Sequence, residues 1–282
     1  MEAKIIDGKA MAAGIRQELK VRLEKLKDEM GITPGLAVIL VGDDPASQTY
    51  VNNKEKACNE VGIDSYIYRL PVDTSEEEVL GLIAKLNADS QIDGILVQLP
   101  LPKHLDEHTV LGAVDARKDV DGTHIVTAGK LLAGEKGFKP CTPKGIIRMI
   151  KSTGLEIQGK HAVVVGRSNI VGKPVALLLL NENATVTMCH SKTEDLQSVC
   201  AGADILVAAI GKPGFITGDY IKERAVVIDV GTTKVDGVFK GDVVFEEASK
   251  KAAFISPVPG GVGPMTIAML MENTVEAGET YA

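Results

Sequence analysis

The sequence predicts an α/β protein built of two αβα lobes. Short runs rich in Val, Ile and Leu alternate with longer amphipathic stretches, which is typical of βαβ units around a parallel sheet. The 282 residues exceed the size of one ordinary domain. A content of 45% hydrophobic and only 4% aromatic residues indicates packed, aliphatic cores.

The strands and helices follow from apolar runs and from helical spacing of apolar residues. The predicted strands lie near Leu36–Val41, Tyr66–Leu70, Gly94–Leu99, His161–Val165, Thr185–Met188, Asp204–Ile210 and Ala225–Val230. The predicted helices lie around Ala10–Met30, Ala46–Val61, Ser75–Ala88, Pro143–Thr153, Lys173–Asn181 and Thr193–Ala201.

The most natural seam between the lobes is Gly134–Thr142, where Gly and Pro interrupt the pattern. We therefore expect a first lobe at 1–141, joined by a last helix at 264–282, and a second lobe at 142–263. A ligand cleft is expected between the two lobes, since clefts between domains are where ligands usually bind.

Charge and hydropathy exclude several classes of partner. The net charge of −7 comes without a Lys/Arg block, which argues against binding to nucleic acid or to a membrane surface. The N-terminus has no apolar segment, and the longest apolar runs are strand-sized, well short of the ~20 residues of a membrane span. We expect a soluble, cytoplasmic protein with a small-molecule ligand.

Cysteine and histidine offer no further chemistry. The four cysteines lie far apart in sequence and are expected to be reduced, half-buried thiols. His104 and His108 are four residues apart, but no further ligand cluster is nearby. No metal site is therefore predicted.

A glycine-containing turn follows the strand His161–Val165. Gly166-Arg167-Ser168 and then Gly172 lead directly into an apolar helix, and glycines at such a turn let the backbone approach a pyrophosphate at the helix N-terminus. The spacing departs from GxGxxG, because Ser168 replaces the second glycine, so a purely structural turn is the alternative. The segment favours a Rossmann-like C-terminal lobe that binds a dinucleotide.

The end of the next strand indicates which dinucleotide. An NAD enzyme would carry an Asp or Glu there for the ribose hydroxyl, but the segment 189–193 reads Cys-His-Ser-Lys-Thr. Ser191, Lys192 and Arg167 are donors, which suit a 2′-phosphate, so NADP is preferred over NAD. Alternatively, Ser191 or Thr193 merely caps the following helix.

Lys54 lies in the middle of an apolar helical stripe. Tyr50, Val51, Ala57, Cys58 and Val61 cluster on the same third of the circumference. A lysine there must snorkel outward, pair with a carboxylate, or accept a lowered pKa through desolvation. The last option would make Lys54 a neutral general base.

Three other segments could contribute to a ligand site. Gln98 is a polar residue at the carboxyl end of an apolar strand, where α/β ligand sites form. Asp121 precedes Gly122, although a turn also explains this pair. The late Pro- and Gly-rich segment Ser256–Thr266 has a backbone that could line a ligand.

Together these segments resemble the bifunctional methylenetetrahydrofolate dehydrogenase/cyclohydrolase family over nearly the whole chain. The resemblance implies NADP-dependent oxidation of 5,10-methylenetetrahydrofolate to the 5,10-methenyl form, then hydrolysis to 10-formyltetrahydrofolate. It also implies a role in one-carbon metabolism and a homodimer joined through the dinucleotide lobe. The matching segments are Tyr50–Ala57, Val97–Pro102, Lys118–Gly122, Pro140–Pro143, Gly166–Pro174, Cys189–Thr193 and Pro257–Thr266.

The resemblance also implies roles for single residues. Lys54 would be the base of the hydrolysis, and Gln98 would tune and orient it. Tyr50 would stack on the aminobenzoyl ring of the folate, and Asp121 would hydrogen-bond the pterin. The folate pocket would further be lined by Val51, Val97, Leu99, Pro259, Gly260, Gly261, Val262 and Gly263.

By the same resemblance, the cofactor contacts would come from Gly166, Arg167, Ser168, Ser191 and Thr232. Many relatives have Ile-Asn at positions 232 and 233, where this chain has two threonines. A main-chain contact to the nicotinamide would survive that change.

Two rival functions fit parts of the sequence. A monofunctional NAD-dependent dehydrogenase would require an acidic residue after the second strand of the dinucleotide lobe, and the sequence has none there. A non-catalytic dinucleotide sensor would leave Lys54 on its apolar stripe unexplained.

Overall fold

The computed structural model describes residues 2–281, which fold into two compact units. Unit 1 contains the described residues up to Ala12 together with Thr142–Thr266. Unit 2 contains Ala13–Cys141 and the segment that begins at Ile267. The expected lobes at 1–141 with 264–282 and at 142–263 stay a prediction as functional units, and the structure places the described residues up to Ala12 with Thr142–Thr266.

Unit 1 is built on a parallel sheet. The chain passes from β5 outward to β6 and then crosses to β7 on the other side of β5. The carboxyl ends of β5 and β7 therefore form a topological switch point, where α/β sheets bind ligands. Within the described residues this sheet has the order β1 (Lys4–Ile5), β11 (Phe254–Ile255), β8 (Val226–Asp229), β7 (Ile205–Ala208), β5 (His161–Val165) and β6 (Thr185–Cys189).

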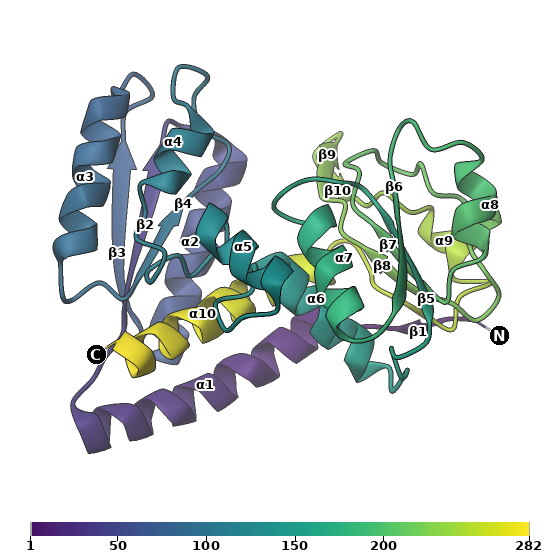
Figure 1. Cartoon of the computed structure of the whole chain (residues 1–282), viewed down its shortest axis with the longest axis horizontal. Helices are drawn as coiled ribbons and strands as arrows, with labels where there is room; N and C mark the ends of the chain where they lie inside the picture. Colours follow the sequence, from purple (N-terminus) through teal and green to yellow (C-terminus); the bar gives the residue numbers. More distant parts are fainter. Residues whose placement is uncertain (1, 282) are drawn as a thin grey trace. The chain divides into compact units, whose positions relative to one another are not determined.

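Helices cover both faces of this sheet (Figure 1). α6 (Cys141–Ser152) and α7 (Gly172–Asn181) lie on one side, and α8 (Leu196–Ala201) and α9 (Phe245–Ala248) lie on the other. The 3-10 turn η1 (Gly218–Tyr220) and the hairpin β9 (Thr233–Val235) and β10 (Val238–Lys240) complete the unit. Alternate residues of β5, β7 and β8 are buried against α8 and α9, as the period of a strand requires.

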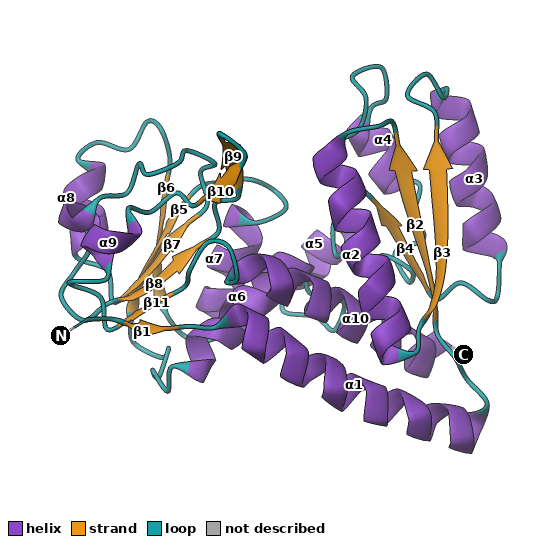
Figure 2. Ribbon diagram, turned by 180° about the vertical axis from the view of Figure 1, so that it is seen from behind, coloured by secondary structure: helices purple, strands orange, loops and turns teal. Residues whose placement is uncertain are grey.

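Unit 2 has a smaller parallel sheet, with β2 (Gly35–Val41) between β3 (Asp64–Leu70) and β4 (Gly94–Val97). α2 (Pro45–Val61) and α3 (Glu76–Ala88) lie on opposite sides of it (Figure 2). β2 and β4 are completely buried, as expected of parallel strands covered on both faces. The unit also contains most of α1 (Gly8–Met30), α4 (Glu107–Gly112), α5 (Ile125–Ala133) and most of α10 (Val262–Tyr281).

The predicted α/β class is confirmed, and each predicted strand and helix overlaps an observed one. β1, β9, β10, β11, α4, α5 and α9 were not predicted, because these elements are only two to nine residues long. The four cysteines are free and buried. Among the described residues, no helix is both long enough and apolar enough to cross a membrane.

Candidate active site

Lys54 lies on the buried face of α2. The helix starts sharply because Asp44 accepts a hydrogen bond from the Ser47 N–H and Pro45 occupies its first turn. Val51 and Cys58 are buried one turn to either side, and Lys54 itself is only 8% exposed. The predicted position of the lysine on an apolar stripe is confirmed.

Gln98 lies directly against this amine. Lys54 Nζ donates a hydrogen bond of 2.8 Å to Gln98 Oε1. The Gln98 side chain is oriented by its own Nε2, which donates to the Leu99 carbonyl at 2.6 Å, and its backbone N–H donates to Ile39 O in the neighbouring strand at 2.8 Å. The amide oxygen is therefore fixed on the lysine by the end of β4.

Burial lowers the pKa of Lys54, and nearby Asp121, Cys141 and Cys58 oppose that shift. Among the described residues the Lys54 amine has no ion pair, and its hydrogen bond is to a neutral amide. A buried amine without a carboxylate bonded to it favours the neutral form. Lys54 is therefore more readily deprotonated than an exposed lysine, as a general base must be.

The segment that carries Asp121 is held from two sides. Its carbonyl accepts a hydrogen bond from the Cys141 N–H at 3.2 Å. The preceding carbonyl, that of Val120, accepts from Asn273 Nδ2 at 2.8 Å and from Cys141 Sγ at 3.3 Å. Asp121 is half-buried and close enough to Lys54 to affect its pKa. The structure thus brings Lys54, Gln98 and Asp121 together.

Asn273 and Cys141 were missed by the sequence reasoning as supports of this site. Asn273 is completely buried in α10, and its amide also donates to the Lys139 carbonyl at 3.0 Å. The available signal was a polar amide within the largely apolar run of the last helix.

The remaining predicted folate residues divide between the units. Tyr50 and Leu99 are half-buried, whereas Val51 and Val97 are buried, all in unit 2. The segment Pro259–Gly263 belongs to unit 1, where its backbone packs tightly, since a Cβ at Gly8 would lie 2.0 Å from the Gly261 carbonyl oxygen. The contacts of these residues to a folate stay predictions.

A pocket of about 310 Å³ lies at the switch point of unit 1. Gly166, at the end of β5, has φ +132 and approaches the Ala209 carbonyl so closely that a Cβ would lie 2.2 Å from its oxygen. The glycine is therefore required by both its conformation and the close approach. The pocket is lined by Val165, Gly166, Arg167, Ser168, His190, Ser191, Leu196, Ala209, Ile210, Lys212 and Phe215.

This lining is basic and contains no carboxylate. Arg167 and Ser191 are exposed, as are the side chains of Ser168 and Lys212. Ser168 Oγ accepts hydrogen bonds of 3.2 Å from the N–H groups of Val171 and Gly172 at the start of α7, which leaves its O–H able to donate. The residues fit a phosphorylated dinucleotide, because donors and positive charge face the pocket where an NAD site would have an acid.

The alternative in which Ser191 or Thr193 caps the next helix is wrong. α8 begins later than predicted, and Asp195 caps it by accepting from Ser198 N–H at 3.4 Å. Thr193 Oγ1 instead accepts from the His190 N–H at 2.9 Å.

Thr232 is exposed between β8 and β9 and does not line this pocket. His190 and Lys212 do line it and were not among the predicted site residues. Lys212 could have been found from its position, because it stands four residues after the end of β7, near the carboxyl edge of the sheet.

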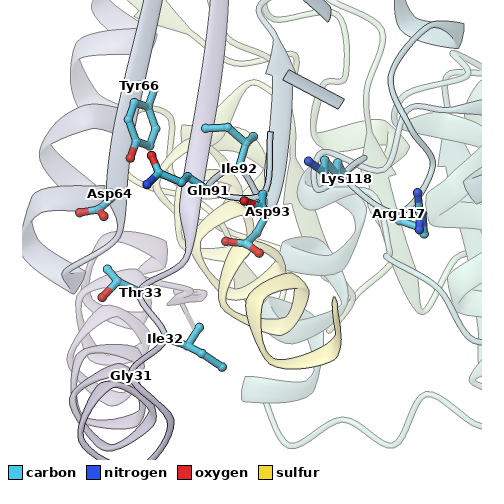
Figure 3. A pocket seen from close by; sticks show the side chains of 11 residues that line it. Gly31, Ile32, Thr33, Asp64, Tyr66, Gln91, Ile92, Asp93, Arg117 and Lys118 are labelled. Carbon is cyan, nitrogen blue, oxygen red and sulfur yellow. The ribbon is translucent and has the colours of Figure 1, made fainter. Parts of the chain in front are cut away.

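A second pocket, of about 530 Å³, lies at the amino end of the unit 2 sheet, opposite the end that carries Gln98 (Figure 3). Asp64, Tyr66, Asp93 and Lys118 contribute to it, but Lys118 Nζ already donates to the carbonyls of Leu86 and Asp89. None of the predicted site residues lines it. Within residues 2–281, no group of three or more His, Cys, Asp or Glu residues is placed to hold a metal ion.

Comparison with known proteins decides the family. The model of the tetrahydrofolate dehydrogenase/cyclohydrolase catalytic domain matches residues 6–121, and that of the corresponding NAD(P)-binding domain matches residues 140–282. The chain belongs to the tetrahydrofolate dehydrogenase/cyclohydrolase family. The family resemblance inferred from the sequence is confirmed.

Relatives in this family cover the whole chain. The bifunctional protein FolD of Acetivibrio thermocellus is 57% identical over 100% of this chain and 99% of its own. The crystal structure of the bifunctional FolD enzyme of Campylobacter jejuni has a TM-score of 0.97 at 48% identity and covers 99% of this chain and 100% of that one. The FolD of Trypanosoma brucei, complexed with NADP and an inhibitor, has a TM-score of 0.95 at 41% identity and covers 99% and 98%.

The lowered pKa of Lys54 predicts a pH-dependent stability. Between its folded pKa and the ordinary value of 10.5, the unfolded chain binds a proton at Lys54 that the folded chain does not, so the free energy of unfolding rises with pH. Relative to Lys54→Met, wild type should gain up to about 1.4 kcal/mol per pH unit in that window. At pH 7 the Met variant should be the more stable protein.

Urea unfolding followed by circular dichroism at pH 7, 8 and 9 measures this difference. Lys56→Met removes an exposed lysine from the same helix and should leave the pH dependence of wild type unchanged. Parallel pH profiles for wild type and Lys54→Met would mean that Lys54 is charged in the folded protein.

Proposed function

We propose that this family member oxidises 5,10-methylenetetrahydrofolate to the 5,10-methenyl form with NADP and hydrolyses that product to 10-formyltetrahydrofolate. The observation that carries the proposal is the buried Lys54 amine, bonded to Gln98 Oε1 at 2.8 Å within the matched catalytic domain. A base of this kind is what the hydrolysis requires. The basic pocket of unit 1 supports the choice of NADP for the oxidation.

NADP, when bound, accepts the hydride released by the methylene carbon. Gly166 would allow the close approach of the diphosphate, and the Ser168 hydroxyl would donate to it. Arg167 and Ser191 would hold the 2′-phosphate, with Lys212 contributing further positive charge to the pocket. Thr232 is proposed to contact the nicotinamide through its main chain.

The folate itself assists the oxidation. Loss of hydride leaves a positive charge that the two folate nitrogens share, so no protein acid is needed for this step. The work of the protein is to position the one-carbon bridge. Tyr50 would stack on the aminobenzoyl ring and Asp121 would accept hydrogen bonds from the pterin. Val51, Val97, Leu99 and the Pro259–Gly263 loop would line the rest of the folate site.

The hydrolysis uses the chemistry of Lys54. Water adds to the positively charged methenyl carbon and loses one proton, which the neutral Nζ accepts. The resulting ammonium can return that proton to N5 of the folate as the bond between carbon and N5 breaks. The remaining hydroxyl proton then passes to Nζ and on to water as the carbonyl forms, so one proton is released overall and the formyl group stays on N10. Gln98 would hold Nζ in place through both steps, because its amide oxygen accepts from either form of the amine.

We further propose a homodimer that joins through unit 1. β6 is an edge strand without a single charged residue, although soluble proteins normally protect such edges with charge, proline or short length. The other edge, β1, has two residues and carries Lys4. Exposed Leu180 and Met188 provide apolar surface in α7 and in β6 itself.

The proposed compartment is the cytoplasm. The four cysteines are free and buried, which is the usual state of thiols in a reducing environment.

Replacing Lys54 should separate the two activities. In Lys54→Met the hydrolysis of methenyltetrahydrofolate should slow by about 10²- to 10⁴-fold, the usual effect of removing a general base. The formation of NADPH should persist, because hydride transfer needs no proton acceptor. Absorbance assays that follow NADPH and the methenyl compound together measure both steps.

Lys56→Met again serves as the matched control and should retain both activities. Unchanged hydrolysis in Lys54→Met would remove the lysine from the mechanism. A wild-type protein that binds the dinucleotide but turns over no folate would instead support a sensor.

Arg167→Ala should act on the choice of dinucleotide. Loss of one charge-assisted bond to the 2′-phosphate should raise the KM for NADP about tenfold or more, while the weaker reaction with NAD should be unaffected. Arg224→Ala is the control, since it removes an arginine from the amino end of the same sheet. Equal losses with NADP and NAD would contradict a 2′-phosphate contact, and a wild type that prefers NAD would support the rival dehydrogenase.

Met188→Lys should disrupt the proposed dimer by placing a charge on the β6 edge. Sedimentation velocity at micromolar concentration should give a dimer for wild type and a monomer for the variant. Val238→Lys, at an exposed position of β10, should remain dimeric. A monomeric wild type, or a Met188→Lys protein that is still dimeric, would reject this interface.

A further inference from the structure

Two buried aspartates stand at the carboxyl edge of the unit 1 sheet, and the proposed mechanism uses neither. Asp229 ends β8 and is 4% exposed, and Asp242 lies just before Val243 and is completely buried. The Asp229 carboxylate accepts three backbone hydrogen bonds, from Gly231 and Asp242 at 2.9 Å and from Val243 at 3.0 Å. Asp229 therefore fastens the segment around Asp242 to the centre of the sheet.

Asp242 continues the connection toward the dinucleotide pocket. Its Oδ2 accepts hydrogen bonds from the N–H groups of Ile210 at 2.7 Å and Gly211 at 3.0 Å. Its carbonyl also accepts from the Ile216 N–H at 2.9 Å. The loop from Ala209 to Phe215, which contributes Ala209, Ile210, Lys212 and Phe215 to the lining of the pocket, is thus attached to one carboxylate.

Burying the carboxylates of Asp229 and Asp242 costs electrostatic free energy that packing does not require. Within the described residues, neither carboxylate is paired with a basic side chain, and Asp242 Oδ1 is buried without a hydrogen-bond partner. Burial raises the pKa of Asp229 to about 6, and the nearby Asp242 contributes to that shift. A neutral apolar side chain would fill the space at lower electrostatic cost, and what it would lack is the two hydrogen bonds that the Asp242 carboxylate accepts from the loop.

We infer that Asp242 is a positioning residue for the adenosine end of the dinucleotide, acting through the backbone amides of Ile210 and Gly211. The inference rests on the proposed function of the unit 1 pocket. Its physical basis is that the loop already lies very close to the phosphate-binding turn: a Cβ at Gly166 would lie 2.2 Å from the Ala209 carbonyl oxygen. A shift of the loop would change the width of the pocket at the phosphate-binding turn.

The glycine before Asp242 supports this reading of the segment. A Cβ at Gly241 would lie 1.9 Å from Asp229 Oδ2, so the chain can pass the first carboxylate only with a glycine there. Gly241 and Asp242 therefore pack directly against the Asp229 carboxylate, and the Ala209–Phe215 loop is hydrogen-bonded to Asp242.

The test uses calorimetric titration of the full-length protein with adenosine 2′,5′-diphosphate, which carries the 2′-phosphate but no nicotinamide. Asp242→Ala removes both loop contacts and should weaken binding about tenfold or more, whereas Asp242→Asn keeps an acceptor oxygen and should stay within about twofold of wild type. Asp204→Ala is the control, because Asp204 accepts a backbone N–H at the amino end of β5. It should bind like wild type.

The hydrolysis of methenyltetrahydrofolate, which consumes no dinucleotide, checks each variant and should be unchanged. If Asp242→Ala does not fold, Asp242→Ser replaces it, since a hydroxyl is too short to bond both amides. Wild-type affinity in the Ala or Ser variant, or equal losses in Asp242→Ala and Asp242→Asn, would overturn the positioning role. If wild type itself fails to bind the probe, the proposed cofactor pocket is wrong and the inference falls with it.

Discussion

Parallel pairing of strands at a topological switch point is the constraint on which both candidate sites depend. In unit 2 the switch lies between β2 and β4, and the Gln98 N–H extends their pairing by donating to Ile39 O. In unit 1 it lies between β5 and β7, and Ala209 N–H donates to Val165 O in the same way. Each site is therefore assembled from the first residues beyond two paired strands, where the connections diverge and leave space for a ligand.

The same constraint explains why the two sites can contain polar side chains whose burial is unfavourable. The central strands of the two sheets are almost completely buried, namely β2, β4, β5, β7 and β8. The residues that follow these strands are therefore anchored to a rigid sheet. Lys54 and Asp242 are both buried: Lys54 donates a hydrogen bond to Gln98 just after β4, and Asp242 accepts one from Ile210 just after β7. Free energy released by aliphatic packing in the sheets offsets the desolvation of these groups.

The sequence predicted local features well and long-range partnerships poorly. The position of Lys54 could be predicted, because a helical stripe needs only residues within four turns of one another. Its bond to Gln98, 44 residues away, followed only from a family resemblance, since helical periodicity does not give the order of strands. Asp242 carried no signal at all, because its partners at 210 and 211 belong to another strand connection.

Short elements were missed for a related reason. β1 and β11 have two residues each and pair with one another across about 250 residues of chain, so neither has a pattern of its own to recognise. Asn273 is similar, because its contacts to Val120 and Lys139 O become visible only when α10 is placed against the Asp121 segment. In each case the missing information is tertiary, and no refinement of helix or strand propensity would supply it.

The choice of glutamine at position 98 completes the argument about Lys54. A glutamate there would also accept a hydrogen bond from Nζ, but its charge would stabilise the ammonium and raise the pKa of the lysine. The amide oxygen holds the same atom at 2.8 Å without a counter-charge, so desolvation dominates and lowers the pKa of the amine. Asp121, half-buried and acting through space, opposes that shift. Gln98 therefore fixes the position of Nζ, while burial and Asp121 act on its pKa in opposite directions.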